Sequence, residues 1–282
     1  MTTISDVQRA APEGLTQADL DRFREVQRLA YRSAEAVAAE LKPGTTEKEA
    51  ARSMRAWLAD GGVHDWFHVP FAWFGDRTAF YGFRTPFQFF PTDRRLEEGM
   101  PYILDVAPIV DGYTGDIGYA GRLGENAAHE RLLDDLAEHR ALILERVRAR
   151  DTLSDVYAAV TDLARRQGYE NRHRQYPGAV IAHRIERRRP ARREPRIVGG
   201  FGAPSLRALA RSALLARRRG WSPLWAGGAA SDHPPVPGLW ALEPHLGLRG
   251  VGAKFEELLV ITDDDAYWLD EDLPHVRRWA GR

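Results

Sequence analysis

The sequence predicts an α+β fold in which two related halves pack around a shared site. Two observations support this prediction. A helix, a capped turn, a second helix and a group of strands follow one another twice along the chain, and two aspartates, Asp105 and Asp116, flank a strand turn in the first copy. Two copies are too few for a solenoid, so the repeat indicates paired halves. A chance recurrence of helix pairs and strands is the alternative.

The first half begins with two predicted helices. Apolar residues follow a helical period over residues 16–41, and Thr16 stands where an N-cap is expected. Thr46 and Glu49 then have the spacing of a capping box, in which each side chain satisfies the other's free backbone N–H group. We therefore predict a second helix that ends near Gly61.

The second half repeats this pattern. A long amphipathic stretch over residues 126–150 predicts a helix, and Thr152 then takes the capping role that Thr46 has in the first half. The short helix after Thr152 is expected to end at Gly168.

Strands are expected in three stretches, residues 65–120, 169–184 and 237–269. The first of these loses the helical period and becomes aromatic and β-branched, with Gly-containing turns at residues 74–76, 98–99 and 111–112. We therefore predict antiparallel strands for this stretch.

The length and the segment order predict one domain over residues 1–282, because α/β chains of this size often form one large core. Residues 186–236 interrupt the second half. They are basic and rich in Pro and Gly, and they contain a short helical segment. We interpret them as an irregular surface insertion with a solvated basic face, because the arginines are not interleaved with the aromatic residues that a nucleic-acid site would use.

Composition excludes several classes of function. The chain is 44% hydrophobic and 28% charged, as in ordinary globular proteins, and its 40 basic and 40 acidic residues give a formal net charge of zero. We therefore expect neither nucleic acid nor a membrane as a partner. The absence of cysteine excludes disulfides, thiolate metal sites and a cysteine nucleophile, so any metal must be bound by Asp, Glu or His.

The chain shows no targeting signal. Its N-terminal segment lacks a basic region followed by an apolar run, and nowhere does an apolar stretch approach the roughly 18 residues of a membrane helix. A cytoplasmic location is the expectation. The oligomeric state is left open, a homodimer included.

The segment around Asp105 and Asp116 is the most informative in the sequence. Asp105 follows an apolar, strand-like run, and an Asp-Gly turn at residues 111–112 separates it from Asp116. Two strands joined by this turn would place both carboxylates side by side. A buried, unpaired carboxylate costs several kcal/mol, so the pair indicates a bound cation. Structural capping of the turn is the alternative.

These aspartates resemble the paired-aspartate hairpin of the pita-bread metallopeptidases, the family of methionine aminopeptidase, aminopeptidase P, prolidase and creatinase. The Pro-Gly-Thr-Thr-Glu turn at residues 43–47 is also similar to a turn between the family's first two helices. The resemblance covers roughly residues 16–185 and 237–270. It implies a fold of two pseudo-symmetric α+β halves around a curved antiparallel sheet. No separate N-terminal domain is expected, a layout closer to methionine aminopeptidase.

The resemblance also implies a set of metal ligands. Glu243 lies in Leu-Glu-Pro, similar to a family strand that ends in Glu-Pro, and Glu256 lies in a segment similar to the family's last ligand-bearing strand. His183 has the right order in the chain but not the usual glycine neighbours. The metal ligands implied are Asp105, Asp116, His183, Glu243 and Glu256. For Glu243 and Glu256, ion pairs with arginines are the alternative.

Such a ligand set suits two divalent ions, Mn, Fe, Co or Zn, because two cations offset four carboxylates. The resemblance then implies a dinuclear-metal hydrolase in which a metal-bridging hydroxide attacks a carbonyl carbon. Glu243 is the candidate for carrying the proton from the water to the leaving nitrogen.

Two further family histidines have no counterpart at the matching positions, near Phe87 and after His183. His68, His173, His233 and His245 are the histidines that could replace them. We predict a catalytic role for His245, because residues 243 and 245 share one face of a strand. Each of the four can also be an ordinary packing histidine.

The predicted function is an aminopeptidase or Xaa-Pro dipeptidase that cleaves short peptides. The missing histidines favour an alternative, a related enzyme that acts on the C–N bond of a small, amide-like molecule, since fold alone does not fix the reaction. A catalytically altered binding protein is the third hypothesis. Residues 65–90 hold an unusual number of aromatic side chains, mainly as predicted core, and any that face the metals would favour an apolar substrate group.

Overall fold

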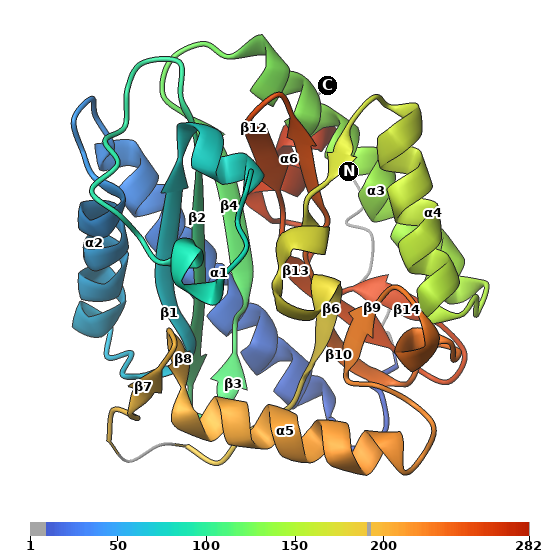
Figure 1. The fold of residues 1–282 in the computed structure, drawn as a ribbon. Helices are drawn as coiled ribbons and strands as arrows, with labels where there is room; N and C mark the ends of the chain where they lie inside the picture. The colour runs from blue at the N-terminus through green and yellow to red at the C-terminus, as the bar shows by residue number, and fades with distance from the viewer. Residues whose placement is uncertain (1–9, 191–192, 282) are drawn as a thin grey trace, which may run out of the picture.

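A computed structural model of the chain describes residues 10–190 and 193–281, and it has two helix-and-sheet halves side by side (Figure 1). In the first half, two helices cover a sheet in the order β3-β2-β1-β8-β7, with β4 also paired to β2. Its main elements are α1 (Gln17–Glu40), α2 (Glu47–Asp60), β1 (Asp65–Phe74), β2 (Pro101–Val110), β3 (Tyr113–Thr114) and β4 (Ile117–Arg122). The predicted helix pair and antiparallel strands are confirmed.

The second half repeats this order. Two helices flank a sheet in the order β14-β13-β10-β6-β9, and a small sheet β12-β11-β5 adjoins it. The helices are α3 (Ala127–Arg148), α4 (Leu153–Arg166) and the short α6 (Pro274–Ala280). The strands are β5 (Glu170–Asn171), β6 (Val180–Ile185), β9 (Leu224–Ala226), β10 (Gly238–Leu242), β11 (His245–Leu248), β12 (Val251–Lys254), β13 (Glu257–Ile261) and β14 (Ala266–Trp268).

The two halves meet at their sheets. Gly118 in β4 pairs antiparallel with Glu256, which lies between β12 and β13. Every strand pair in the three sheets is antiparallel. Because the bridge joins strands from both halves, carboxylates of the first half and of the second half lie close together at this junction.

Residues 75–100 differ from the prediction of continuous antiparallel sheet. They contain the 3-10 helices η1 (Gly75–Ala79) and η2 (Pro86–Phe89), joined by loops. Gly75 and Gly82 have positive φ angles, which end extended backbone, and Pro86 starts η2. The segment returns to the sheet only at β2.

The predicted insertion is more regular than the sequence indicated. Residues 186–236 contain the strands β7 (Ile197–Val198) and β8 (Phe201–Gly202) and the helix α5 (Ala203–Arg217), as well as β9. β8 pairs with β1 through His68 and Phe201, and α5 lies along the end of the molecule beneath both halves (Figure 1). The segment therefore extends the first sheet and carries residues toward the junction.

None of the helices among the described residues combines the length and apolar character that crossing a bilayer requires.

The N-terminus of α2 fixes the loop that follows β1. Thr46 and Glu49 form the predicted capping box, with Thr46 N donating to Glu49 Oε2 at 2.8 Å. Buried Glu47 accepts hydrogen bonds from Phe74 N and Thr92 N and pairs with Arg77 at 2.8 Å. This carboxylate thus anchors both ends of residues 75–92.

Replacing the cap tests its contribution. Thr46→Ala removes the side-chain acceptor for Glu49 N and should lower the free energy of unfolding by about 1 kcal/mol. Thr46→Ser keeps the hydroxyl and should lie within a few tenths of a kcal/mol of the parent. Urea unfolding followed by circular dichroism measures both values. Equal losses in the two variants would show that the cap does not stabilise the helix.

Candidate active site

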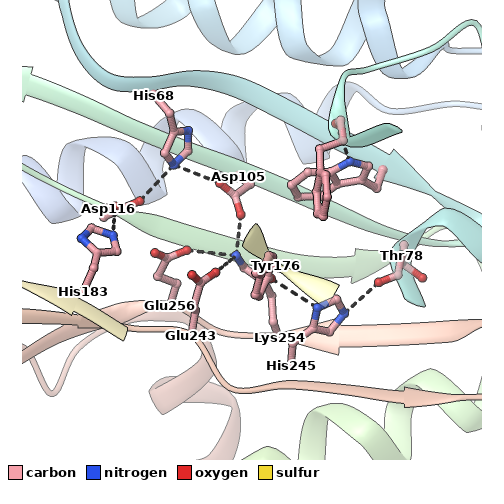
Figure 2. Close-up of polar contacts among 12 residues, drawn as sticks. His68, Thr78, Asp105, Asp116, Tyr176, His183, Glu243, His245, Lys254 and Glu256 are labelled. Atoms are coloured by element: carbon pink, nitrogen blue, oxygen red, sulfur yellow. Dashed lines mark hydrogen bonds and ion pairs between the residues drawn. The ribbon is translucent and has the colours of Figure 1, made fainter. Parts of the chain in front are cut away.

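The five predicted ligand residues converge at the junction between the halves (Figure 2). Each is at most 9% exposed. Asp105 lies on β2 and Asp116 just before β4, while the second half supplies the other three. These are His183 on β6, Glu243 directly after β10, and Glu256 between β12 and β13.

The first-half hairpin brings the two aspartates together. Asp111 and Gly112 form its turn with φ angles of 51° and 88°, and this left-handed geometry favours glycine. A side chain on Gly112 would also collide with the carbonyl of Arg188. Beyond the turn, β4 pairs with β2 so that Asp105 lies opposite Gly118. The predicted side-by-side arrangement is present.

Two overlapping groups of side chains are close enough to share an ion. Asp116, His183 and Glu256 form one, and Asp105, Glu243 and Glu256 form the other, with their ligand atoms within 4.8 Å of one another in each group. His183 Nε2 lies 3.0 Å from Asp116 Oδ2, and Phe67 stacks on the imidazole at 4.7 Å between ring centroids. Both groups have the carboxylate-rich chemistry of hard or borderline divalent ions.

Lys254 extends into the second group. Its ammonium donates to Asp105 Oδ2 at 2.5 Å, Glu243 Oε2 at 2.8 Å and Glu256 Oε2 at 3.0 Å (Figure 2). Burial alone lowers the pKa of Lys254, but the three carboxylates outweigh it and raise that pKa well above its usual value. Burial raises the pKa of Glu243 and Glu256, with Lys254 acting in the opposite direction. The alternative of ion pairs with arginines is not what the structure shows, since the partner of both glutamates is Lys254.

His68 is the second cationic group in the cluster. Its Nε2 lies 3.2 Å from Asp105 Oδ1 and 3.1 Å from Asp116 Oδ1, and its Nδ1 lies 3.0 Å from the carbonyl of Val69. Burial alone lowers the pKa of His68, yet the two aspartates raise it to about 9. Burial likewise opposes the ionisation of Asp116, but His68 and His183 hold its pKa well below the usual range.

His245 lies outside this cluster. Its Nε2 is 2.8 Å from the carbonyl of Thr78 and its Nδ1 is 3.2 Å from the hydroxyl of Tyr176 (Figure 2). A carbonyl only accepts, so Nε2 carries the proton, and burial lowers the His245 pKa and keeps the ring neutral. Nδ1 then accepts from Tyr176. His245 thus orients Tyr176, whose ring centroid is 5.3 Å from Lys254 Nζ.

An apolar cavity of about 380 Å³ leads to the cluster. Its lining includes all five predicted ligand residues together with His68. The rest of the lining is aromatic or aliphatic and includes Phe67, Phe71, Trp73, Phe89, Phe90, Phe201, Leu206 and Leu209. Part of the aromatic stretch therefore faces the site, as do residues from the segment predicted as a surface insertion.

The other histidines considered lie away from the cluster. His173 is buried against Tyr157, and His233 accepts from Ser222 N. Phe87, near the position of one missing family histidine, is 80% exposed and is not part of the cavity wall. His68, on a different element, is the described histidine that joins His183 beside the aspartates.

The fold is that of the pita-bread enzymes. The methionine aminopeptidase of Rickettsia prowazekii superposes with a TM-score of 0.60 at 17% identity, covering 90% of this chain and 98% of that one. The X-Pro aminopeptidase of Thermotoga maritima gives 0.63 at 16% identity over 90% of this chain and 61% of that one. The prolidase of Pyrococcus horikoshii gives 0.60 at 13% identity over 92% and 64%. The chain thus spans about three fifths of the longer neighbours.

The sequence itself matches the model of metallopeptidase family M24 over residues 21–263, and the chain belongs to that family. No curated protein sequence matches it. The predicted family, fold class and enzyme class, a metal-dependent hydrolase of the metallopeptidase type, are thereby confirmed.

The family implies divalent metal ions, and the residues present can be tested for the fit of such an ion. Asp116, His183 and Glu256 offer two carboxylates and an imidazole, and among the described residues His183 Nδ1 is buried without a hydrogen-bond partner. Asp105, Glu243 and Glu256 instead already share the ammonium of Lys254.

Substitutions that remove the charge of a carboxylate but keep its shape test the predicted ligands. Asp116→Asn and Glu256→Gln should each remove most bound Mn²⁺ or Co²⁺, because each takes an anionic oxygen from the group formed by Asp116, His183 and Glu256. Asp111→Asn is the control, since this aspartate lies exposed in the neighbouring turn. Metal content after desalting, measured by plasma mass spectrometry, gives the result. Unchanged content in either cluster variant would remove that residue from the ligand set.

Proposed function

We propose that this chain is an aminopeptidase that removes an apolar residue from the N-terminus of short peptides. The supporting observation is the apolar cavity that ends at the acidic cluster. Its volume of about 380 Å³ is within the usual range for small-ligand sites, roughly 300–1,000 Å³, and suits one large side chain with the adjoining amide. The cluster at its inner end carries the polar groups that an amide hydrolysis needs.

The choice of aminopeptidase over Xaa-Pro dipeptidase rests on the charges of the cavity. Among the described residues that line it, none is an arginine or a lysine. A dipeptide would place its terminal carboxylate close to the reacting amide, where the cationic side chain among the described lining residues, His68, is already paired with Asp105 and Asp116. A terminal ammonium, in contrast, would find the carboxylates of the cluster.

We propose that Asp116, His183 and Glu256 hold a divalent ion, with Mn, Co, Fe and Zn as candidates. When bound, such an ion supplies the Lewis acidity that activates water and polarises a carbonyl. Glu243 is our candidate for carrying a proton to the leaving nitrogen, because burial raises its pKa and favours the protonated form. We assign His245 a positioning role through Tyr176, since both of its ring nitrogens are engaged away from the cluster.

A second candidate is hydrolysis of a non-peptide amide that has an apolar group on the acyl side. It is favoured by the same wall, which has no arginine or lysine among its described residues, and by the exposed position of Phe87, whose ring lies outside the cavity lining. His68 supplies an imidazole from β1 instead. This arrangement departs from the family pattern and allows a different substrate.

A substrate panel separates the two candidates. Phe-, Leu- and Met-initiated tripeptides, Xaa-Pro dipeptides and N-acyl aromatic amides are incubated with the Mn²⁺-loaded or Co²⁺-loaded protein, and the products are quantified by mass spectrometry. Aminopeptidase function predicts the highest kcat/KM for the tripeptides with apolar N-termini. Turnover of N-acyl amides alone would favour the second candidate. A preference for Xaa-Pro dipeptides would contradict the inference that the cavity has no free cationic group for a terminal carboxylate.

The cavity wall gives a further prediction. Phe201→Ala removes an aromatic side chain that packs beside His68 and Phe67, so kcat/KM for a Phe-initiated substrate should fall about tenfold or more. Phe87→Ala, which removes an exposed ring outside the wall, should leave it within twofold. Steady-state kinetics with both variants measures the effect. An equal change in the two variants would show that the cavity does not hold the substrate side chain.

A further inference from the structure

We infer that Lys254 is a built-in cation that fills one of the two ion positions of this centre, so that the protein takes a single divalent ion, at Asp116, His183 and Glu256. The inference concerns ion content and is independent of which substrate is hydrolysed.

The carboxylates that bind the Lys254 ammonium are the same ones that could share an ion. Asp105, Glu243 and Glu256 form one of the two groups whose ligand atoms lie within 4.8 Å of one another. The same three carboxylates accept the three hydrogen bonds of the Lys254 ammonium, at 2.5, 2.8 and 3.0 Å. An ammonium has three donors, and all three are used here. The nitrogen therefore lies where an ion shared by this group would lie.

The residues around Lys254 accommodate its side chain. A Cβ atom on Gly118 would lie 2.0 Å from Lys254 Cε, so the glycine on β4 clears the path along which the lysine crosses into the first half. Tyr176 packs over the ammonium on another side, and His245 fixes that ring through its hydroxyl. Lys254 is only 2% exposed. Such burial of an ammonium requires paired carboxylates.

The total charge of the cluster also favours a single divalent ion. The four carboxylates of the cluster carry at most four negative charges, which two divalent ions would balance without any help. A buried ammonium beside two such ions would be repelled by both of them. With one divalent ion, Lys254 supplies part of the positive charge that the cluster still needs. The negative charge of the carboxylates is therefore balanced either by two metal ions or by one metal ion together with Lys254, and the two arrangements exclude each other.

The residue type also matters. The chain has only three lysines among its 40 basic residues, and the other two, Lys42 and Lys48, lie on the surface. An ammonium is a compact point charge with three donors, whereas a guanidinium is a wide planar fork. A compact group with three donors matches three converging carboxylates better than a planar fork does.

Ion stoichiometry tests the inference. The parent protein, Lys254→Ala and the surface control Lys42→Ala are saturated with Mn²⁺ and desalted, and the ions per chain are counted by plasma mass spectrometry. We expect one ion per chain in the parent and in the control, and two in Lys254→Ala. Two ions in the parent, or none, would overturn the inference, and so would a Lys254→Ala protein that folds and still binds one.

A second measurement covers the case in which Lys254→Ala does not fold. Electron paramagnetic resonance of the Mn²⁺-loaded parent should show the six-line spectrum of an isolated ion at every loading level. A spectrum of two exchange-coupled ions would overturn the inference. Gly118→Ala, which displaces the lysine without removing it, should shift the saturated protein toward the coupled spectrum, and an uncoupled spectrum with one ion in this variant would contradict the proposed role of the glycine.

Discussion

Four carboxylates buried within one cluster are the constraint on which this structure depends. Ionised side chains removed from water are costly unless positive charge lies beside them. The protein supplies part of that charge itself, through Lys254 among Asp105, Glu243 and Glu256 and through His68 between the two aspartates. The hairpin and the Gly118 bridge serve this purpose, since they bring acidic groups of one half against cationic and acidic groups of the other.

The cavity and the acidic cluster form one continuous site with an apolar part and a polar part. Aromatic side chains from β1 and from the segment after β6 make an uncharged wall, and the polar groups gather at its inner end. In the function proposed above, this wall would bind an apolar group through burial and place the adjoining amide against the acidic cluster. The segment after β6, which adds β8 and α5, pairs with the first sheet and contributes Phe201, Leu206 and Leu209 to the cavity lining.

Much of this arrangement could be predicted from sequence, because the signals are local. The capping box of Thr46 and Glu49 and the turn at Asp111 and Gly112 are present in the structure, and the five residues predicted as ligands lie together in it. His68 could not be placed, since register shifts on both sides of it in β1, next to Pro70, change which way its side chain points. The position of Lys254 could have been predicted from the sequence. Residues two apart on an extended chain share a face, so the side chains of Lys254 and Glu256 are expected to point the same way. The same rule misled for His245, because Pro244 separates it from β10 and it turns toward Thr78.

Anomalous diffraction from crystals grown with Mn²⁺ tests the central claim most directly, because it locates each ion and each charged side chain together. The account predicts one anomalous peak, in contact with Asp116, His183 and Glu256, while the Lys254 ammonium stays among the other carboxylates. Two peaks with Lys254 turned out of the cluster would contradict it, as would a centre without any peak.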